Sequence, residues 1–113
     1  MRVLIIDVKS EMQTCLMARA ELLNEIDACK LGGFRVLKVI HGYGSHGVGG
    51  AIKKTIHTEL KNLKNQHKIT DYIPCEKWTQ NNPLRQKAIS FSNELLADSD
   101  LRILNSGVTI VLI

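Results

Sequence analysis

A histidine followed by a glycine-rich segment is the part of this sequence best suited to chemistry. His41 comes directly after an aliphatic run, and five of the eight glycines in the chain fall between Gly42 and Gly50. Glycines let a ligand approach the backbone amides closely, and the start of the helix expected near Gly50 attracts anions. The segment therefore predicts a phosphate-binding loop, with His41 as a phosphate contact or general acid–base. The alternative role for His41 is a hydrogen bond that caps a backbone carbonyl.

Two common phosphate-binding loops do not match this segment. The spacing from Gly44 to Gly49 is that of the motif GxxxxGK(S/T), but Gly50 and Ala51 replace its lysine and hydroxyl residue. The stretch from Gly42 to Gly47 matches GxGxxG, but no acidic residue ends a following strand about 20 residues further on, as dinucleotide binding requires. These departures argue against nucleotide hydrolysis and hydride transfer.

The predicted helix after the loop is basic. The chain carries a net charge of +4, and Glu59 is the only acidic residue between His41 and Lys68. A basic helix beside a glycine-rich loop favours contact with a nucleic-acid backbone, largely independent of base sequence. The alternative is an ordinary solvated helix face. The basic residues beside the apolar stripe of this helix are Lys53, Lys54, His57, Lys61 and Lys64.

These residues must be positioned by alternating strands and helices. Aliphatic runs predict strands over 2–7, 34–40, 69–73 and 107–113, and 101–104 is a weaker candidate that would pair with the last of them. Helices are predicted from an N-cap at Ser10 to Gly32, over 51–65, and from Pro83 after the N-cap Asn82. The apolar stripe of the first helix includes Leu16 and Ile26. This order predicts an α/β sheet with packed helices, in one domain spanning residues 1–113.

Three segments resemble the Smr (small MutS-related) domain family. The residues Val39-Ile40-His41-Gly42-Tyr43-Gly44 match its strand and HGxG motif, and Gly50-Ala51-Ile52-Lys53 resembles the start of its next helix. The stretch from Asn105 to Leu112 resembles its closing Gly-x-Thr-x-Val strand. The resemblance implies a βαβαββ two-layer sandwich, similar to the C-terminal domain of bacterial translation initiation factor three. Residues from about 75 to 104 look like an insertion that carries a third helix before the last strand.

The same resemblance implies binding of DNA or RNA, with nicking endonuclease activity in several members. The family motif L-D-x-H corresponds to Ile6-Asp7-Val8-Lys9, so Lys9 replaces the histidine and the expected cleavage activity is in question. The catalytic candidates are His41, Asp7 and Lys9, with hydrolysis of a phosphodiester bond as the reaction. The candidates for binding nucleic acid through its phosphates are Gly42, Tyr43, Gly44, Ser45, His46, Gly47, Gly49, Gly50, Lys53, Lys54, His57 and Lys61. Tyr43 and Trp78 are candidates for stacking on bases.

Several other properties are expected from composition. The chain has no apolar stretch near the ~20 residues that a membrane-spanning helix needs, and no secretory signal, which predicts a soluble, cytoplasmic protein. Its three separated cysteines indicate neither a disulfide framework nor a zinc site, and we expect no structural metal. Mg²⁺ is the cofactor to consider if the domain cleaves. We expect a monomer or weak dimer. Other functions left open are an inactive nucleic-acid or protein-interaction module and a binder of a phosphorylated metabolite.

Overall fold

A four-stranded mixed sheet forms the centre of the computed structural model, which describes residues 2–9, 14–42 and 49–113. The strand order is β1-β2-β4-β3. β1 runs parallel to β2, whereas β4 runs antiparallel to both of its neighbours, β2 and β3. The strands are β1 (Val3–Asp7), β2 (Val36–Ile40), β3 (Asp71–Pro74) and β4 (Val108–Leu112). All four predicted main strands are thus present.

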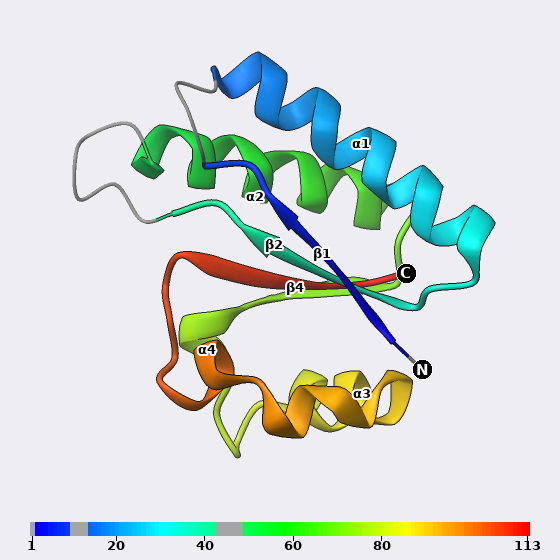
Figure 1. Cartoon of the computed structure of the whole chain (residues 1–113), viewed down its shortest axis with the longest axis vertical. Coiled ribbons are helices and arrows are strands. Elements are labelled where there is room, and N and C mark those ends of the chain that lie inside the picture. Colours follow the sequence, from blue (N-terminus) through cyan, green and yellow to red (C-terminus); the bar gives the residue numbers. More distant parts are fainter. Residues whose placement is uncertain (1, 10–13, 43–48) are drawn as a thin grey trace.

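Two long helices cover one face of the sheet (Figure 1). They are α1 (Cys15–Gly32) and α2 (Gly49–Asn65). The α2 helix buries its predicted apolar stripe of Ile52, Ile56, Leu60 and Leu63. In α1, Ile26 is buried as expected, but Leu16 is 72% exposed, because it lies outside the buried stripe of this helix, which consists of Ala18, Leu22, Ile26 and Cys29.

The start of α1 differs from the sequence expectation. The helix begins at Cys15, and its N-cap is Thr14, whose hydroxyl accepts a hydrogen bond from the backbone N–H of Met17. A side-chain acceptor at this place satisfies one of the free amides of the first turn. The predicted N-cap at Ser10 is therefore wrong for this helix, and Ser10 itself lies outside the described residues.

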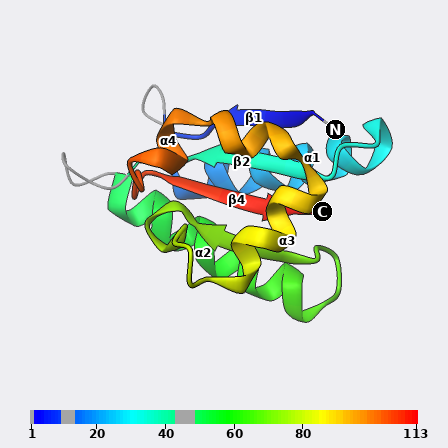
Figure 2. The same cartoon turned by 90° about the horizontal axis from the view of Figure 1, so that it is seen from below.

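The inserted segment covers the opposite face of the sheet (Figure 2). It forms η1 (Cys75–Lys77), α3 (Pro83–Phe91), η2 (Asn93–Ala97) and α4 (Ser99–Arg102). Asn82 caps α3 as predicted, with Pro83 in its first turn. The α/β sandwich expected from the sequence is confirmed, and the insertion adds a layer of short helices to it.

The weaker strand predicted over residues 101–104 is wrong. Asp98 ends the preceding turn, and its Oδ1 accepts hydrogen bonds from the backbone N–H groups of Asp100 and Leu101. These bonds satisfy the first amides of a helix, so the chain forms the single turn α4 instead of a strand. Leu101 is buried from that turn.

Lys38 attaches the insertion to the middle of the sheet. Its side chain is 9% exposed, and its Nζ lies 2.8 Å from a carboxylate oxygen of Asp98 and 2.7 Å from one of Asp100. Burial opposes the charge on Lys38, but the hydrogen bonds from its ammonium to both carboxylates outweigh burial and raise its pKa. A lysine inside a strand that is buried on both faces is therefore fully paired.

The position of β4 between β2 and β3 brings distant residues together. In this register Val39 pairs with Thr109 and Ile40 with Val108. Beyond the end of β2, the backbone N–H groups of His41 and Gly42 both donate to the carbonyl of Gly107. The first histidine of the glycine-rich segment is thereby held against the start of β4. No helix in the described part of the chain is long and apolar enough to span a membrane.

Candidate nucleic-acid interface

His41 lies at the end of β2 with its side chain fully buried. Its Nδ1 lies 2.7 Å from the carbonyl oxygen of Gly42. Burial disfavours the charged ring and lowers the pKa of His41 to about 4, against the small opposing effect of this hydrogen bond. The ring is therefore neutral at pH 7. Because a carbonyl can only accept a hydrogen bond, the single ring proton is on Nδ1.

Thr109 connects His41 to a second histidine. Its Oγ1 lies 2.8 Å from Nε2 of His41 and 2.8 Å from Nε2 of His57. The unprotonated Nε2 of His41 must accept the hydroxyl proton of Thr109, because Nδ1 already holds the only ring proton. The threonine oxygen is then left to accept a hydrogen bond, so Nε2 of His57 is the donor. The three side chains form one chain of hydrogen bonds with a single direction, which we call the histidine relay.

The other ring nitrogen of His57 is available to a ligand. Burial, followed by the nearby Lys53 ammonium, lowers the pKa of His57, so this ring also tends to be neutral near pH 7. With its proton on Nε2, Nδ1 carries a lone pair, and no described residue donates to it. Among the described residues, the only buried side-chain polar atom without a partner is Oε1 of Glu76. Nδ1 of His57 therefore reaches solvent as an unoccupied hydrogen-bond acceptor.

His57 lines a groove of about 480 Å³ between α2, β3, η1 and the start of α3. The ring of Tyr72 on β3 lies beside it, with centroids 6.0 Å apart. Three lysines line the same groove: Lys61, Lys64 and Lys77. Lys64 forms an ion pair with Asp71 at 3.2 Å, whereas Lys61 and Lys77 have no acidic partner in the described part of the chain. We call this surface the α2–β3 groove. Its charge and shape suit a polyanion.

The sequence of the chain matches the model of a known domain family. A model of the Smr domain matches residues 10–79, more than half of the 113-residue chain. The chain belongs to the Smr domain family. The matched region contains His41, His57 and most of the α2–β3 groove, whereas Thr109 lies beyond it. Searches of curated proteins and of solved structures found no match.

The sequence predicted some of the residues that line the α2–β3 groove of this Smr domain, but not all of them. His57 and Lys61 were expected to contact phosphate, and they lie in the groove together. Tyr72 and Lys77 were not expected, because they come from β3 and η1 and have no periodic or motif signal that joins them to α2. The register of the sheet supplies that connection. The relay depends in the same way on Thr109, far away in the sequence.

Lys53, one of the predicted phosphate contacts, is hydrogen-bonded within the protein. Its Nζ donates to a carboxylate oxygen of Glu76 and to the backbone carbonyl of Ser106, 2.8 Å away. Its side chain is 20% exposed. This ammonium is held by two acceptors within the protein, and its contact with phosphate stays a prediction. Lys54, by contrast, is exposed on α2.

Asp7 and Lys9 are not brought to His41. The Oδ1 of Asp7 accepts the backbone N–H of Lys9 at 2.9 Å, and Lys9 Nζ lies 3.7 Å from its Oδ2. Asp7 pairs with Ile40, which packs on the face covered by the insertion, whereas the ring of His41 lies on the α2 face. The structure thus places Asp7 and the His41 ring on different faces of the sheet, and a joint catalytic role for Asp7, Lys9 and His41 stays a prediction without support from this arrangement.

The predicted phosphate loop is described only at its ends. Gly42 has a φ of 74°, a conformation that glycine adopts without strain. Gly49 and Gly50 form the first turn of α2, which begins two residues earlier than expected. The remaining predicted loop residues lie outside the described residues: Tyr43, Gly44, Ser45, His46 and Gly47. Their contact with phosphate stays a prediction.

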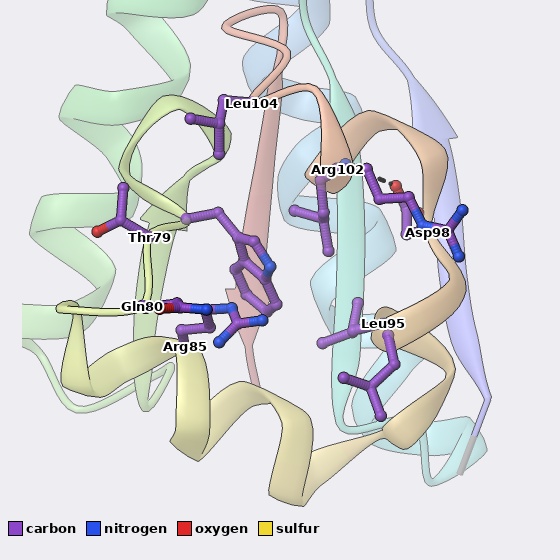
Figure 3. A pocket seen from close by; sticks show the side chains of 10 residues that line it. Thr79, Gln80, Arg85, Leu95, Asp98, Arg102 and Leu104 are labelled. Atoms are coloured by element: carbon purple, nitrogen blue, oxygen red, sulfur yellow. Dashed lines mark hydrogen bonds between the residues drawn. The ribbon is translucent and has the colours of Figure 1, made fainter.

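Trp78 belongs to a different hollow, on the opposite face of the sheet. It lines a pocket of about 270 Å³ with Arg85, Leu95 and Leu104 (Figure 3). The guanidinium carbon of Arg85 lies 5.9 Å from the centre of the indole ring. Trp78 is 7% exposed and belongs to the second core cluster, so it packs inside the protein rather than offering an open stacking surface.

No metal site is evident in the described ranges 2–9, 14–42 and 49–113. Within them, no group of three or more histidine, cysteine, aspartate or glutamate side chains is placed to hold an ion. The cysteines are free thiols, and burial raises the pKa of Cys29 to about 11 and of Cys75 to about 12. Neither thiol is a reactive thiolate at neutral pH.

Proposed function

We propose that this protein is a nucleic-acid-binding Smr domain, formed by residues 1–113, whose α2–β3 groove contacts the sugar–phosphate backbone. The observation that supports this most directly is the pair of lysines, Lys61 and Lys77, that line one groove and have no acidic partner among the residues that the structure describes. They come from two elements on opposite sides of it. Ammonium groups arranged in this way attract successive phosphates without reading base sequence.

The acidic groups near the groove do not cancel this charge. Asp71 is paired with Lys64, and Glu76 is paired with Lys53. Each of these carboxylates is therefore balanced by a lysine that is separate from Lys61 and Lys77. Lys61 also lies one helical turn after His57, so the two side chains occupy the same side of α2. The groove keeps a net positive charge next to a neutral imidazole.

The burial of His41 bears on the cleavage activity implied by the family resemblance. A ring with both nitrogens hydrogen-bonded inside the protein cannot touch a scissile phosphate. Lys9, which replaces the family histidine, pairs with Asp7 away from the α2 face. We therefore propose binding as the function, and we assign no cleavage step to His41, Asp7 or Lys9.

The test is a binding titration at two salt concentrations. Fluorescence anisotropy with labelled single-stranded and duplex oligonucleotides at about 50 and about 200 mM salt reports both affinity and its salt dependence. The variant Lys61→Glu with Lys77→Glu should bind at least tenfold more weakly. The matched control is Arg2→Glu with Arg102→Glu, which makes the same change in net charge at two exposed positions that do not line the groove.

Two results would contradict the proposal. Equal loss of binding in the control variant Arg2→Glu with Arg102→Glu would mean that only overall charge matters and that the groove has no special part. Tight, salt-insensitive binding of a small phosphorylated molecule, with no binding of oligonucleotides, would instead favour a metabolite-binding protein. The expected result is steep salt dependence that becomes shallower, by about one phosphate contact per lysine, in the groove variant.

A further inference from the structure

The histidine relay determines which hydrogen-bonding group the groove offers at His57. The buried carbonyl of Gly42 places the proton of His41 on Nδ1, and Thr109 passes this direction to the next ring. His57 is thereby held as the tautomer with a proton on Nε2 and a lone pair on Nδ1. An imidazole free in water exchanges between both tautomers, whereas this one presents an acceptor to the groove.

Among the side chains that line this groove, a neutral atom that can only accept is unusual, because the amide of Asn65 and the hydroxyl of Tyr72 can donate as well as accept. Lys61 and Lys77 are donors that match phosphate oxygens, which only accept. Asn82 is already used, because its Oδ1 accepts from Leu84 and its Nδ2 donates to the carbonyl of Lys77. The carboxylate of Asp71 is paired with Lys64 and carries a charge that repels phosphate. His57 Nδ1 is therefore a neutral acceptor beside cationic donors.

RNA and DNA differ in whether their backbone has a hydrogen-bond donor for this acceptor. A DNA backbone offers phosphate and ether oxygens but no hydrogen-bond donor. A ribose 2′-hydroxyl is a donor on the carbon next to the one that carries the 3′-phosphate, and it is the group by which proteins distinguish RNA from DNA. Phosphates bound by the lysines would bring such sugars alongside the His57 ring.

We infer that His57 is a specificity-determining residue, which accepts a hydrogen bond from a ribose 2′-hydroxyl through Nδ1 and so favours RNA over DNA. This inference rests on the proposed function, because the lysines must first hold the backbone in the groove. In it His41 is a positioning residue: it acts on the ligand only through Thr109 and the tautomer of His57. This assigns a function to the burial of His41.

The experiment compares RNA and DNA oligonucleotides of the same base sequence. The wild-type protein should bind the RNA roughly 2- to 12-fold more tightly, as expected for one neutral hydrogen bond. His57→Phe keeps an aromatic ring without an acceptor and should bring this ratio to about one. Thr109→Val should also lower the ratio, whereas Thr109→Ser keeps the hydroxyl and should preserve it.

A second measurement tests the relay without any ligand. The ¹⁵N chemical shifts of the His57 ring should show a protonated Nε2 and an unprotonated Nδ1 at neutral pH, and this pattern should weaken in Thr109→Val. It needs only folded protein, and Thr109→Ser covers the case in which the valine variant does not fold.

The outcomes separate the two proposals. An RNA to DNA ratio that stays unchanged in His57→Phe, or a protonated Nδ1 in the free protein, overturns the inference while nucleic-acid binding stands. Binding of neither polymer overturns the proposed function, and with it the specificity that rests on it. Retained binding with a ratio near one already in the wild-type protein overturns the inference alone.

Discussion

The rings of His41 and His57 meet edge to face with centroids 5.4 Å apart, and each places its Nε2 2.8 Å from the same hydroxyl of Thr109. One ring is inside the protein and the other borders the α2–β3 groove. Their shared hydroxyl connects the buried histidine of the family motif to a histidine that lines the groove. The first two predictions follow from this arrangement.

The stability of the protein should fall when the pH drops from 7 to about 5. The pKa of His41 is about 4 in the folded state, against 6.5 for an ordinary histidine. Between these two pH values the unfolded chain binds a proton at His41, whereas the folded protein keeps the ring neutral. The contribution of the neutral His41 ring to the free energy of unfolding is fully present above pH 6.5, and it is lost as the pH falls towards 4. The loss at pH 5 should be about 2 kcal/mol from His41. Urea denaturation at pH 7 and pH 5 measures it.

The control for this pH dependence is His41→Gln, which removes the titrating ring. The difference between the two pH values should shrink in this variant, and the remainder should come mainly from His57, whose pKa is also lowered by burial. The carboxylates with lowered pKa, such as Asp100, titrate at lower pH and contribute little in this window. An unchanged pH dependence in His41→Gln would show that the ring is not the source.

Replacing His41 by alanine should weaken the fold without abolishing contact with DNA. The variant loses two internal hydrogen bonds and leaves a cavity at a fully buried position, which should cost roughly 2–4 kcal/mol. Its affinity for a DNA oligonucleotide, measured where the variant is folded, should stay within about twofold, because the lysines of the groove remain. Loss of DNA affinity in a folded variant would place His41 in the interface and contradict its burial.

Two lysines of α2 should separate stability from binding. Lys53→Met removes the partner of Glu76 and of the Ser106 carbonyl, so it should lower the melting temperature. Lys61→Met should leave the melting temperature nearly unchanged and weaken oligonucleotide binding several-fold, since it removes one phosphate contact. A thermal-shift assay and an anisotropy titration on both variants check this. The reverse pattern would mean that Lys53 is the external contact.

The buried Lys38 should be a strong determinant of stability on the other face. Lys38→Ala leaves the carboxylates of Asp98 and Asp100 without their cation and should cost about 3 kcal/mol. Asp98→Asn loses one ion pair but keeps the cap of α4, whereas Asp98→Ala loses both and should be less stable than the asparagine variant by about 1 kcal/mol. Equal stability of the two Asp98 variants would show that the cap of α4 does not contribute to the free energy of unfolding.

Local patterns predicted most of the elements. The aliphatic run of β2 indicated a buried strand, and β2 is buried throughout apart from partly exposed Ile40. The run of β1 indicated a strand covered on both faces, which is wrong, because β1 is an edge strand in which Ile5 is 57% exposed. The spacing of Ile52, Ile56 and Leu60 indicated the buried side of α2. The alternative role for His41, a hydrogen bond to a backbone carbonyl, is the one that the structure shows.

The errors arose where two local signals competed. Ser10 and Thr14 are both good N-caps, and the helix uses the second. The apolar residues Leu101, Ile103 and Leu104 suit a strand by composition, but the Asp98 cap favours a helical turn, which leaves Ile103 72% exposed. Neither choice can be read from residue types alone, because the preferred form depends on what packs against it.

The residue types and their periodicity were enough to establish the α/β order, the basic character of α2 and the family motif around His41. They act over a few residues, which is the range of propensity and of hydrophobic spacing. The arrangement of the site depended on residues that are far apart in the sequence. Thr109 contacts His41, Lys77 lines the same groove as Lys61, and Asp7 lies on the face of the sheet opposite to the His41 ring. Strand order and register set these contacts, and only the packed chain determines them, because burial and hydrogen bonding at one position depend on segments that the local pattern does not include.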